Sequence, residues 1–294
     1  MIDDFTAAAE ALRPELRRHC YRMLGAAHDA DDAVQETMLR AWRARDRYEP
    51  ERSSLRTWLH RIATNVCLTA LEGRARRPLP SFVGAEFDDP EAAFAPGFEV
   101  PWLQPLPEES DLRLAVVAAL QLLPARQRAV LLLREVLDVP AAEVAESLDT
   151  TTASVNSALQ RARARLAEHD VDILEQPEPA GDQRAVVDRY VAAFERADVD
   201  GLTALLAEEV VLEMPPMWNW YVGPERFAGF MRRIYRTRGS VWSTRPIAAN
   251  AQLGFVALLD GNVHTIQLLD VAGGEVRRMT VFQDPEVFSL FAMS

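Results

Sequence analysis

The fold of the N-terminal part of the chain is decided by the stretch Asp29-Ala-Asp-Asp-Ala-Val-Gln-Glu-Thr-Met-Leu-Arg-Ala-Trp42. Asp29 is a favourable N-cap, and the acidic residues after it place negative charge near the positive end of a helix. Helical spacing predicts a buried stripe formed by Ala33, Met38, Ala41 and Trp42. The other face is acidic and polar and consists of Asp32, Gln35, Glu36 and Arg40. Such a face suits a basic protein partner better than DNA, although a solvated helix surface has the same composition.

The length and composition of the chain set the class of protein. It has 294 residues, 49% of them hydrophobic, which suffices for two or three domains with their own cores. No apolar run approaches the roughly 20 residues that span a bilayer, and the acidic start lacks the features of a signal peptide. We therefore expect a cytoplasmic protein without membrane contact. Cys20 and Cys67 have no metal-binding neighbours in sequence, so we expect reduced core thiols and neither a metal nor a cofactor.

The net charge of −12 is unevenly distributed along the chain. All 32 basic residues are Arg, and residues 1–77 carry 14 of them against 12 acidic residues. Residues 78–110 carry no Arg and seven acidic residues. The excess of acid therefore lies in connecting segments, and the acidic total does not exclude a nucleic-acid partner.

Changes of composition predict five segments. Residues 1–77 read as helices, and seven prolines make 78–110 an acidic linker that marks a domain boundary. Within this linker, Val100-Pro-Trp-Leu-Gln-Pro-Leu-Pro107 is too apolar for a plain spacer, so we expect it to dock on a neighbouring domain. Residues 111–169 return to helix, 170–183 form a second linker, and 184–294 change to an α+β pattern.

The α+β segment combines three amphipathic helices with alternating strands. Strands are predicted at 209–214, 241–248, 251–259, 263–269 and 276–282, followed by a short helix at 285–291. Asp260-Gly-Asn and Ala272-Gly-Gly predict hairpin turns between the last three strands. The segment therefore predicts a hairpin-rich antiparallel sheet with helices beside it.

A helix-turn-helix is predicted at 140–166. The first helix runs from Pro140 to Leu148, and Thr150–Thr152 offer N-caps for the second. The second helix is predicted to bury Val155, Leu159, Ala162 and Leu166. Its exposed side chains are Ser154, Asn156, Ser157, Gln160, Arg161 and Arg163. These amides, hydroxyls and guanidinium groups suit the base edges and phosphates of DNA, and a purely structural helical hairpin is the alternative.

A second polar constellation follows the acidic helix. The predicted helix from Ser53 to Leu71 exposes a stripe formed by Arg61, Asn65 and Thr69. Arg74, Arg76 and Arg77 follow its negative end and are suited to gripping a phosphate backbone. The preceding loop, Tyr48–Ser54, is polar enough to hold an unstacked base. A solvated amphipathic helix is again the alternative.

Together these motifs resemble a known family. Residues 29–42, followed by Leu55-Arg-Thr-Trp-Leu-His-Arg-Ile-Ala-Thr-Asn65, look like domain two of extracytoplasmic-function (ECF) sigma-70 factors. Leu122-Leu-Pro-Ala-Arg-Gln-Arg-Ala-Val-Leu-Leu-Leu-Arg-Glu-Val136, with Val155-Asn-Ser-Ala-Leu-Gln-Arg-Ala-Arg163, looks like their domain four. The match covers about residues 8–169, and the motifs occur in the family's order.

The resemblance implies a function and its sites. RNA polymerase core enzyme and promoter DNA would be the partners, and the acidic face with Asp31, Asp32, Gln35 and Glu36 would meet the clamp of the largest subunit. The −10 element would be opened and read by Tyr48, Arg61, Asn65, Thr69, Arg74, Arg76 and Arg77. The −35 element would be read by Ser154, Asn156, Ser157, Gln160, Arg161 and Arg163. Asn156 and Ala158 depart from the pattern, since many relatives carry Arg there, and this implies weaker −35 binding.

The order of elements after Arg184 resembles the SnoaL-like domain, an α+β cone with an apolar cavity that is fused to some sigma factors. The resulting fold class is multidomain, with two all-α domains followed by an α+β cone that acts as an in-cis regulator. A small-molecule pocket would be lined by Met214, Trp218, Tyr221, Phe255, His264 and Phe282. Ordinary core packing explains the same residues, and the ligand stays open.

Two other functions account for part of the chain. Enzymatic relatives of the cone use buried acids and bases, and His264 with Glu213 or Asp270 is the candidate here. A lone histidine on a strand is more often structural, so we expect no enzyme. A helix-turn-helix regulator with a ligand-sensing or enzymatic tail would leave residues 1–77 without a role. The sequence leaves open whether an anti-sigma factor exists.

Overall fold

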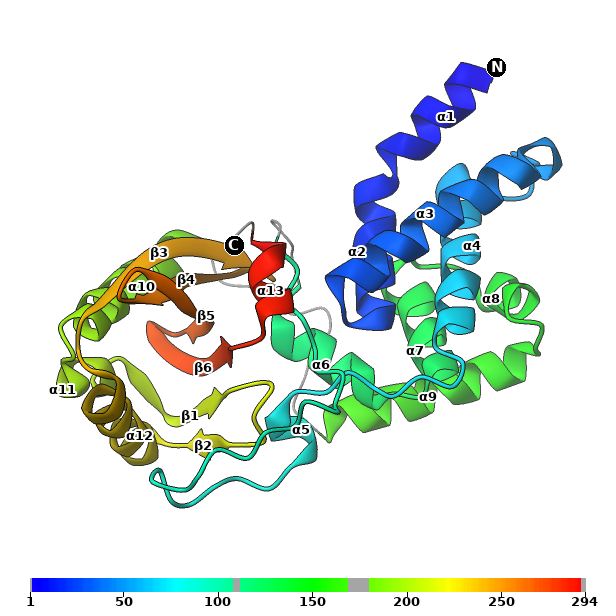
Figure 1. Ribbon diagram of the computed structural model, residues 1–294. Coiled ribbons are helices and arrows are strands. Elements are labelled where there is room, and N and C mark those ends of the chain that lie inside the picture. The colour runs from blue at the N-terminus through cyan, green and yellow to red at the C-terminus, as the bar shows by residue number, and fades with distance from the viewer. Residues whose placement is uncertain (1, 108–111, 169–179, 292–294) are drawn as a thin grey trace. The chain divides into compact units, whose positions relative to one another are not determined.

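A computed structural model describes residues 2–107, 112–168 and 180–291 of the chain (Figure 1). The chain divides into two compact units, each built from two stretches of sequence. Unit one joins Met1–Arg77 to Ala115–Glu175, and unit two joins Pro78–Leu114 to Gln176–Ser294. Most of the predicted linker 170–183 lies outside the described residues. None of the helices in the described ranges has the length and apolar character needed to cross a membrane.

Unit one begins with the helices predicted for the N-terminal segment. They are α1 (Ile2–Ala11), α2 (Arg13–Leu24), α3 (Ala27–Ala44), the short 3-10 helix η1 (Arg45–Arg47) and α4 (Leu55–Ala70). The N-cap of α3 is Ala26 and not the predicted Asp29, because the helix begins three residues earlier. Asp29 lies in the first turn, where its Oδ2 accepts a hydrogen bond from Arg77 Nη2 at 2.8 Å. Of the predicted buried stripe, Trp42 remains 39% exposed.

The second stretch of unit one carries the helix-turn-helix. Its helices are α6 (Leu114–Leu122), α7 (Ala125–Leu131), the π-helix η2 (Leu132–Val136), α8 (Ala141–Ser147) and α9 (Thr152–Ala167). Thr151 caps α9, since its Oγ1 accepts a hydrogen bond from Ser154 N at 3.2 Å. The buried side chains of α9 are the four predicted from the sequence: Val155, Leu159, Ala162 and Leu166.

Arg128 of α7 joins the two stretches of unit one. Its side chain is almost fully buried. Its guanidinium donates a hydrogen bond to the carbonyl oxygen of Met23, near the end of α2. It also donates to the carbonyl oxygen of Leu123 at 3.1 Å and to Gln121 Oε1 at 2.6 Å. The buried charge is thus surrounded by acceptors, which offsets the cost of removing it from water.

Unit two is a six-stranded sheet with helices packed against it (Figure 1). The helices are α10 (Ala180–Glu195), α11 (Val199–Thr203), α12 (Pro224–Arg238) and α13 (Pro285–Leu290). The strands are β1 (Leu206–Glu213), β2 (Trp220–Val222), β3 (Trp242–Ala249), β4 (Gln252–Leu259), β5 (Asn262–Ala272) and β6 (Glu275–Phe282). The strand order is β2-β1-β6-β5-β4-β3. Aromatic and aliphatic side chains of α10 and α12 share the core with the sheet.

The sheet differs from its prediction in two details. Strands β1 and β6 pair in parallel, whereas the other pairs are antiparallel, because the chain crosses the sheet between them. Strand β2 has three residues, too few for an alternating pattern to reveal it. The predicted turns are present, with Asp260, Gly261, Gly273 and Gly274 in the left-handed conformation that tight hairpins require.

The acidic linker packs as part of unit two. Its described residues, 78–107, contain a single short helix, α5 (Pro80–Val83), and otherwise run as an extended strap along the cone. The side chain of Asn219 binds the middle of the linker. Its Oδ1 accepts a hydrogen bond from Ala95 N at 2.7 Å, and its Nδ2 donates one to Ala93 O at 3.2 Å. Asn250 holds its end in the same way, accepting from Leu106 N at 2.8 Å. The predicted docking of the 100–107 segment therefore has its partner in the cone, where Trp102 packs edge-on against Trp218.

A buried charge fixes the start of the strap. Glu213 at the end of β1 is fully buried and accepts from Ser81 Oγ of α5 at 2.7 Å. Its other oxygen accepts from Arg278 Nη1 of β6 at 2.9 Å. Arg278 also lies over the ring of Phe82. This cluster joins two strands and the linker within one hydrogen-bond network.

Candidate nucleic-acid interface

Helix α4 presents the candidate interface on a firmly capped helix. Ser54 is its N-cap, and the Ser54 Oγ accepts a hydrogen bond from Thr57 N at 3.1 Å. The apolar face of α4 is buried through residues that include Leu59, Ala63 and Val66. Asn65 and Thr69 are exposed on the other face, and Arg61 is half-buried beside them. Because the apolar face of α4 is buried, the predicted polar stripe on its other face has a fixed orientation.

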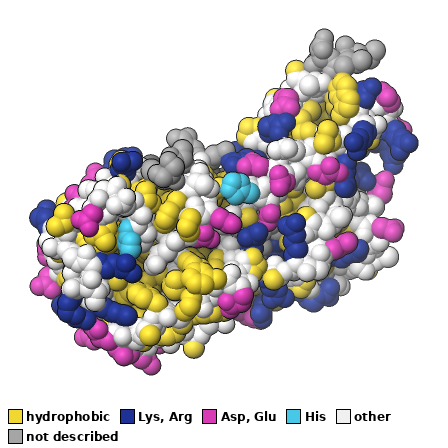
Figure 2. All heavy atoms as spheres, viewed as in Figure 1, with side chains coloured by type: hydrophobic (Ala, Val, Ile, Leu, Met, Phe, Trp, Pro, Cys, Tyr) yellow, Lys and Arg dark blue, Asp and Glu magenta, His cyan; other side chains and the backbone are white. Residues whose placement is uncertain are grey.

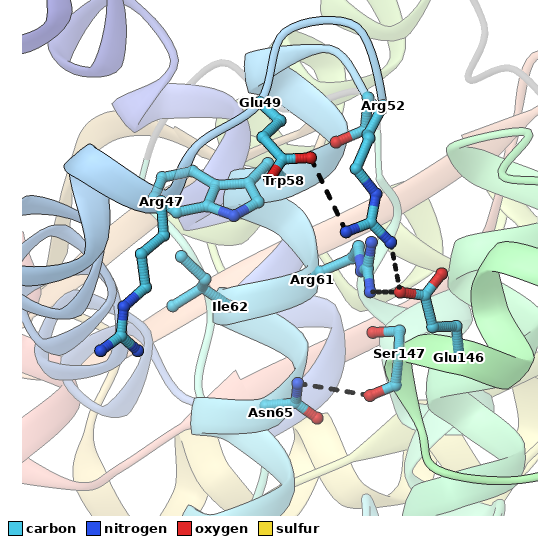
Figure 3. A pocket seen from close by; sticks show the side chains of 10 residues that line it. Arg47, Glu49, Arg52, Trp58, Arg61, Ile62, Asn65, Glu146 and Ser147 are labelled. Carbon is cyan, nitrogen blue, oxygen red and sulfur yellow. Dashed lines mark hydrogen bonds and ion pairs between the residues drawn. The ribbon is translucent and has the colours of Figure 1, made fainter.

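A polar cavity of about 310 Å³ lies beside this stripe (Figure 3). Its lining consists of Arg47, Glu49, Arg52, Ser53, Trp58, Arg61, Ile62, Asn65, Glu146 and Ser147. Trp58 supplies an aromatic surface, and the ring of Tyr48 packs against it at a centroid distance of 5.2 Å. Guanidinium groups beside a half-buried indole are side chains suited to holding an unstacked base and its phosphate.

The far side of the cavity is formed by α8 of the helix-turn-helix. Glu146 Oε1 lies 3.2 Å from Arg52 Nη2 and 3.6 Å from Arg61 Nη2 (Figure 3). Asn65 Nδ2 lies 3.5 Å from the carbonyl oxygen of Ser147. Glu146 therefore meets the same guanidinium groups that a phosphate would meet, and two of the predicted −10 residues, Arg61 and Asn65, face protein in this structure.

The cations after α4 lie outside the cavity lining. Arg74 and Arg76 are exposed, whereas Arg77 is half-buried by its ion pair with Asp29. Arg74 Nη1 is 3.5 Å from Asp29 Oδ1. The carboxylate of Asp29 thus partly neutralises this basic segment.

The acidic face of α3 is divided between paired and unengaged side chains. Asp31 forms an ion pair with Arg17 at 2.5 Å, and Glu36 with Arg40 at 2.6 Å. Asp32 and Gln35 are exposed. Gln35 also borders a groove of about 360 Å³ between α1 and α3, whose apolar lining includes the exposed residues Leu39 and Trp42.

Helix α9 exposes every predicted −35 residue: Ser154, Asn156, Ser157, Gln160, Arg161 and Arg163. Arg163 forms an ion pair with Glu135 of η2 at 2.5 Å. On the face shown in Figure 2, Arg side chains gather over the helical unit, whereas broad hydrophobic areas lie over the sheet unit.

In unit two, the predicted pocket residues separate into two groups. Met214 and His264 line a small cavity inside the cone. Tyr221, Phe255 and Phe282 are buried outside that lining, and Trp218 is used in packing against Trp102 of the linker. Within the described ranges, no group of three or more His, Cys, Asp or Glu side chains is arranged to hold a metal ion.

Comparison with known proteins assigns each part of the chain. Residues 8–77 match Sigma-70 region 2, residues 113–166 match Sigma-70 region 4, and residues 187–283 match the SnoaL-like domain. The chain is 43% identical over 313 residues to the ECF RNA polymerase sigma factor SigG of Mycobacterium tuberculosis. That match covers 99% of this chain and 84% of SigG. The chain belongs to the ECF RNA polymerase sigma factors.

A second relative is similar to this chain in both sequence and fold. SigJ, another ECF RNA polymerase sigma factor of M. tuberculosis, is 32% identical over 210 residues, which are 68% of this chain and 62% of SigJ. The crystal structure of M. tuberculosis SigJ shares the fold, with a TM-score of 0.67 over 99% of each chain at 23% identity. The predicted family, fold class and function are therefore confirmed, and the partners of this sigma factor are RNA polymerase core enzyme and promoter DNA.

Several residues of the interface were missed from the sequence. Trp58 reads as a core residue at its helical position, yet it forms a wall of the cavity. Glu146 and Ser147 lie more than 80 positions from Asn65, so no local pattern connects them to it. Among these cavity residues, the sequence pointed only to Arg52 and Ser53, because they belong to the polar loop Tyr48–Ser54 before α4.

Proposed function

We propose that this sigma factor uses the α4 stripe to open and read the −10 element. Arg61, Asn65 and Thr69, with the 48–54 loop, contact the bases, and the cations at 74–77 contact the backbone. The observation that carries this assignment is the cavity that Arg47, Arg52 and Arg61 line together with Trp58 and Asn65. It combines an aromatic surface for stacking with positive charge for phosphate.

The acidic face of α3 and the exposed face of α9 complete the proposal. Asp31, Asp32, Gln35 and Glu36 bind the clamp of the polymerase largest subunit. The exposed amides and guanidinium groups of α9 read the −35 element in the major groove. Exposure of Asp32 and Gln35 on α3 and of the polar side chains of α9 supports these assignments. Work with polymerase implies a cytoplasmic protein.

Promoter binding requires unit one to open. The −10 and −35 elements are about 25 base pairs apart, which is about 85 Å of duplex at about 3.4 Å per base pair. Domains in contact through Glu146 and Arg128 do not reach both elements at once. We infer that polymerase binding separates the two domains and frees the α4 stripe.

The cone acts as a regulator in cis through the linker. The linker connects the two promoter-reading domains, and its strap is bound to the cone by Asn219, Asn250 and Glu213. Intrachain contacts gain from a high effective concentration, so the cone controls how much linker is available to span the promoter.

We propose no catalysis for the cone. The carboxylates that would assist His264 are engaged elsewhere, Glu213 with Arg278 and Asp270 with Arg113. Burial lowers the pKa of His264, which favours a neutral ring at physiological pH.

The test of the −10 assignment is promoter opening. Arg61→Ala and Asn65→Ala are each expected to lower open-complex formation about tenfold or more, because each removes a charged or bidentate hydrogen-bonding group. Opening is measured with a fluorescent base analogue in the −10 element, and core binding in parallel. Arg43→Ala, an exposed arginine on α3, is the matched control. Normal opening by both variants would remove these residues from the site.

A further inference from the structure

The polar cavity of unit one has two different sides with apolar side chains between them. In the view of Figure 3, Arg47 and Glu146 lie on opposite sides, and Trp58 and Ile62 lie between the two. The volume of about 310 Å³ falls within the range of about 300–1,000 Å³ that small-molecule sites have. Because α8 forms one side, the cavity is complete only while the two helical domains are in contact. It is therefore a site of the free sigma factor.

The side formed by α8 combines a carboxylate with two guanidinium groups. Glu146 Oε1 lies 3.2 Å from Arg52 Nη2 and 3.6 Å from Arg61 Nη2. A carboxylate accepts hydrogen bonds from two adjacent N–H groups, and a guanidinium donates to carbonyl and ring-nitrogen acceptors. Among the neutral bases, guanine alone has N–H groups on two adjacent atoms, N1 and N2, with the O6 and N7 acceptors next to them. This side of the cavity therefore matches the edge of guanine.

Other polar groups of the lining have hydrogen-bonding capacity that the protein does not use. Asn65 Nδ2 lies 3.5 Å from the carbonyl oxygen of Ser147, and Asn65 Oδ1 has no hydrogen-bond partner among the described residues. The Ser147 Oγ is buried and likewise has no partner within the described ranges. Buried polar groups are normally hydrogen-bonded, so this hydroxyl points to a missing partner.

The opposite side supplies a cation that no carboxylate neutralises. Both carboxylates of the lining pair with Arg52, Glu49 at 3.8 Å and Glu146 at 3.2 Å. Arg47 is exposed and forms no ion pair with any of the described residues. Its guanidinium is therefore available to an anionic group, and phosphate is the group that guanidinium binds most readily in two-point contacts. Between these sides, the indole of Trp58 offers a surface on which a base stacks.

We propose that the free sigma factor binds a guanine mononucleotide in this cavity and that the nucleotide holds α8 against α4. The guanine edge bonds to Glu146 and Arg61, the base packs on Trp58, and the phosphate pairs with Arg47. A ligand that touches both helices stabilises the closed arrangement of unit one and competes with −10 DNA for α4. This competition rests on the proposed −10 function, whereas the binding of the nucleotide does not.

Guanosine 5′-monophosphate (GMP) is the first probe, titrated into the full chain by calorimetry, with AMP as the matched nucleotide. We expect GMP to bind at least tenfold more tightly than AMP. Glu146→Gln should weaken GMP binding at least fivefold, because an amide presents one acceptor where the carboxylate presents two. Glu143→Gln, on the same helix but outside the lining, should leave it unchanged. Denaturant midpoints establish that each variant is folded. No GMP binding, equal affinity for GMP and AMP, or unchanged GMP binding by Glu146→Gln would overturn the site.

Arg47→Ala tests the phosphate end of the site. It should lower the affinity for GMP at least fivefold, to the level of guanosine, and leave the affinity for guanosine unchanged. Arg43→Ala, which removes an exposed arginine of α3, is the matched control. An unchanged affinity of Arg47→Ala for GMP would overturn the placement of the phosphate.

Competition with DNA distinguishes this inference from the proposed function. Saturating GMP, but not AMP at the same concentration, should lower the affinity of the free sigma factor for single-stranded −10 DNA at least threefold. Promoter opening without added nucleotide is measured independently. A chain that opens promoters normally but does not bind GMP loses this inference only. A chain that binds GMP, and whose Arg61→Ala and Asn65→Ala variants open promoters normally, loses the −10 assignment only. GMP binding with an unchanged affinity for DNA would overturn the competition.

Discussion

The contact of α8 with α4 and the contact of the linker with the cone both join segments that are distant in sequence, and they differ in kind. In unit one, α8 meets α4 through Glu146 and Arg52, whose side chains are 55% and 67% exposed. In unit two, the linker meets the cone through main-chain hydrogen bonds and the fully buried Glu213. Exposed ion pairs contribute about 0–1 kcal/mol, whereas breaking a buried one costs several. The first contact is suited to exchange with DNA, and the second to lasting attachment.

Arg128 gives unit one a third kind of contact. Its guanidinium is buried against the carbonyl oxygen of Met23, but it also bonds to Gln121 and Leu123 within its own domain. Opening unit one therefore removes only the hydrogen bond to Met23, which water can replace, and leaves those to Gln121 and Leu123. Solvent or a nucleic acid can reproduce these polar contacts between the helical domains.

The largest expected effect comes from breaking the buried pair in unit two. Glu213→Leu leaves Arg278 without its carboxylate, so we expect the free energy of unfolding of unit two to fall by about 3 kcal/mol. The double variant Glu213→Leu/Arg278→Met should recover a large share of this loss, because no charge then stays unpaired. Denaturant unfolding followed by tryptophan fluorescence measures both.

The control for that comparison lies on the same strand. Glu209 is exposed on β1, and Glu209→Leu should change the free energy of unfolding by less than about 0.5 kcal/mol. Equal losses for the two single variants would mean that the buried network does not anchor the strap.

The sequence predicted local features well, because they depend on residues close together in the chain. The stripe of Val155, Leu159, Ala162 and Leu166 follows from helical spacing alone, and the Asp260-Gly261 turn from its backbone requirement. The α4 stripe was likewise predicted from a spacing of four residues. These features need no knowledge of the tertiary fold.

Long-range pairings were not predictable from the sequence. Ser81 and Glu213 are far apart in the chain, and a serine in a proline-rich segment carries no signal of a buried partner. Glu146 likewise reads as one acidic residue on a short helix, and only the packing of α8 brings it to Arg61. The assignment of the linker to the cone depends on such contacts, so composition marked it only as a boundary.

The stability of unit one is expected to depend on pH through two buried histidines. Burial lowers the pKa of His19 well below its ordinary value and also lowers that of His60. His19 Nε2 lies 2.9 Å from Thr64 Oγ1, and His60 Nδ1 is 2.8 Å from the carbonyl oxygen of Arg56. Below about pH 6.5 the unfolded chain binds protons that the folded one does not, so the stability of unit one falls as the pH falls.

The expected slope reaches about 1.4 kcal/mol per pH unit for each such histidine. Unfolding of unit one is followed by far-ultraviolet circular dichroism from about pH 7.5 to about pH 5.5. His19→Gln should reduce the slope, and His28→Gln should not, because His28 is exposed. If both variants show the same slope as the unsubstituted chain, groups other than His19 cause the acid sensitivity.

The smallest expected effect tests whether the α8 contact competes with DNA. Glu146→Gln removes the carboxylate that Arg52 and Arg61 face, so the free sigma factor should bind single-stranded −10 DNA up to about fivefold more tightly, the equivalent of about 1 kcal/mol. Fluorescence anisotropy measures this, and the gain should shrink at high salt. Glu143→Gln, on the same helix but outside the cavity lining, is the matched control. The gain should also vanish once core polymerase is bound, because the proposal has polymerase separate the two domains. A gain that persists in the polymerase complex would mean that the charge of Glu146 acts on DNA directly and not by covering the α4 stripe.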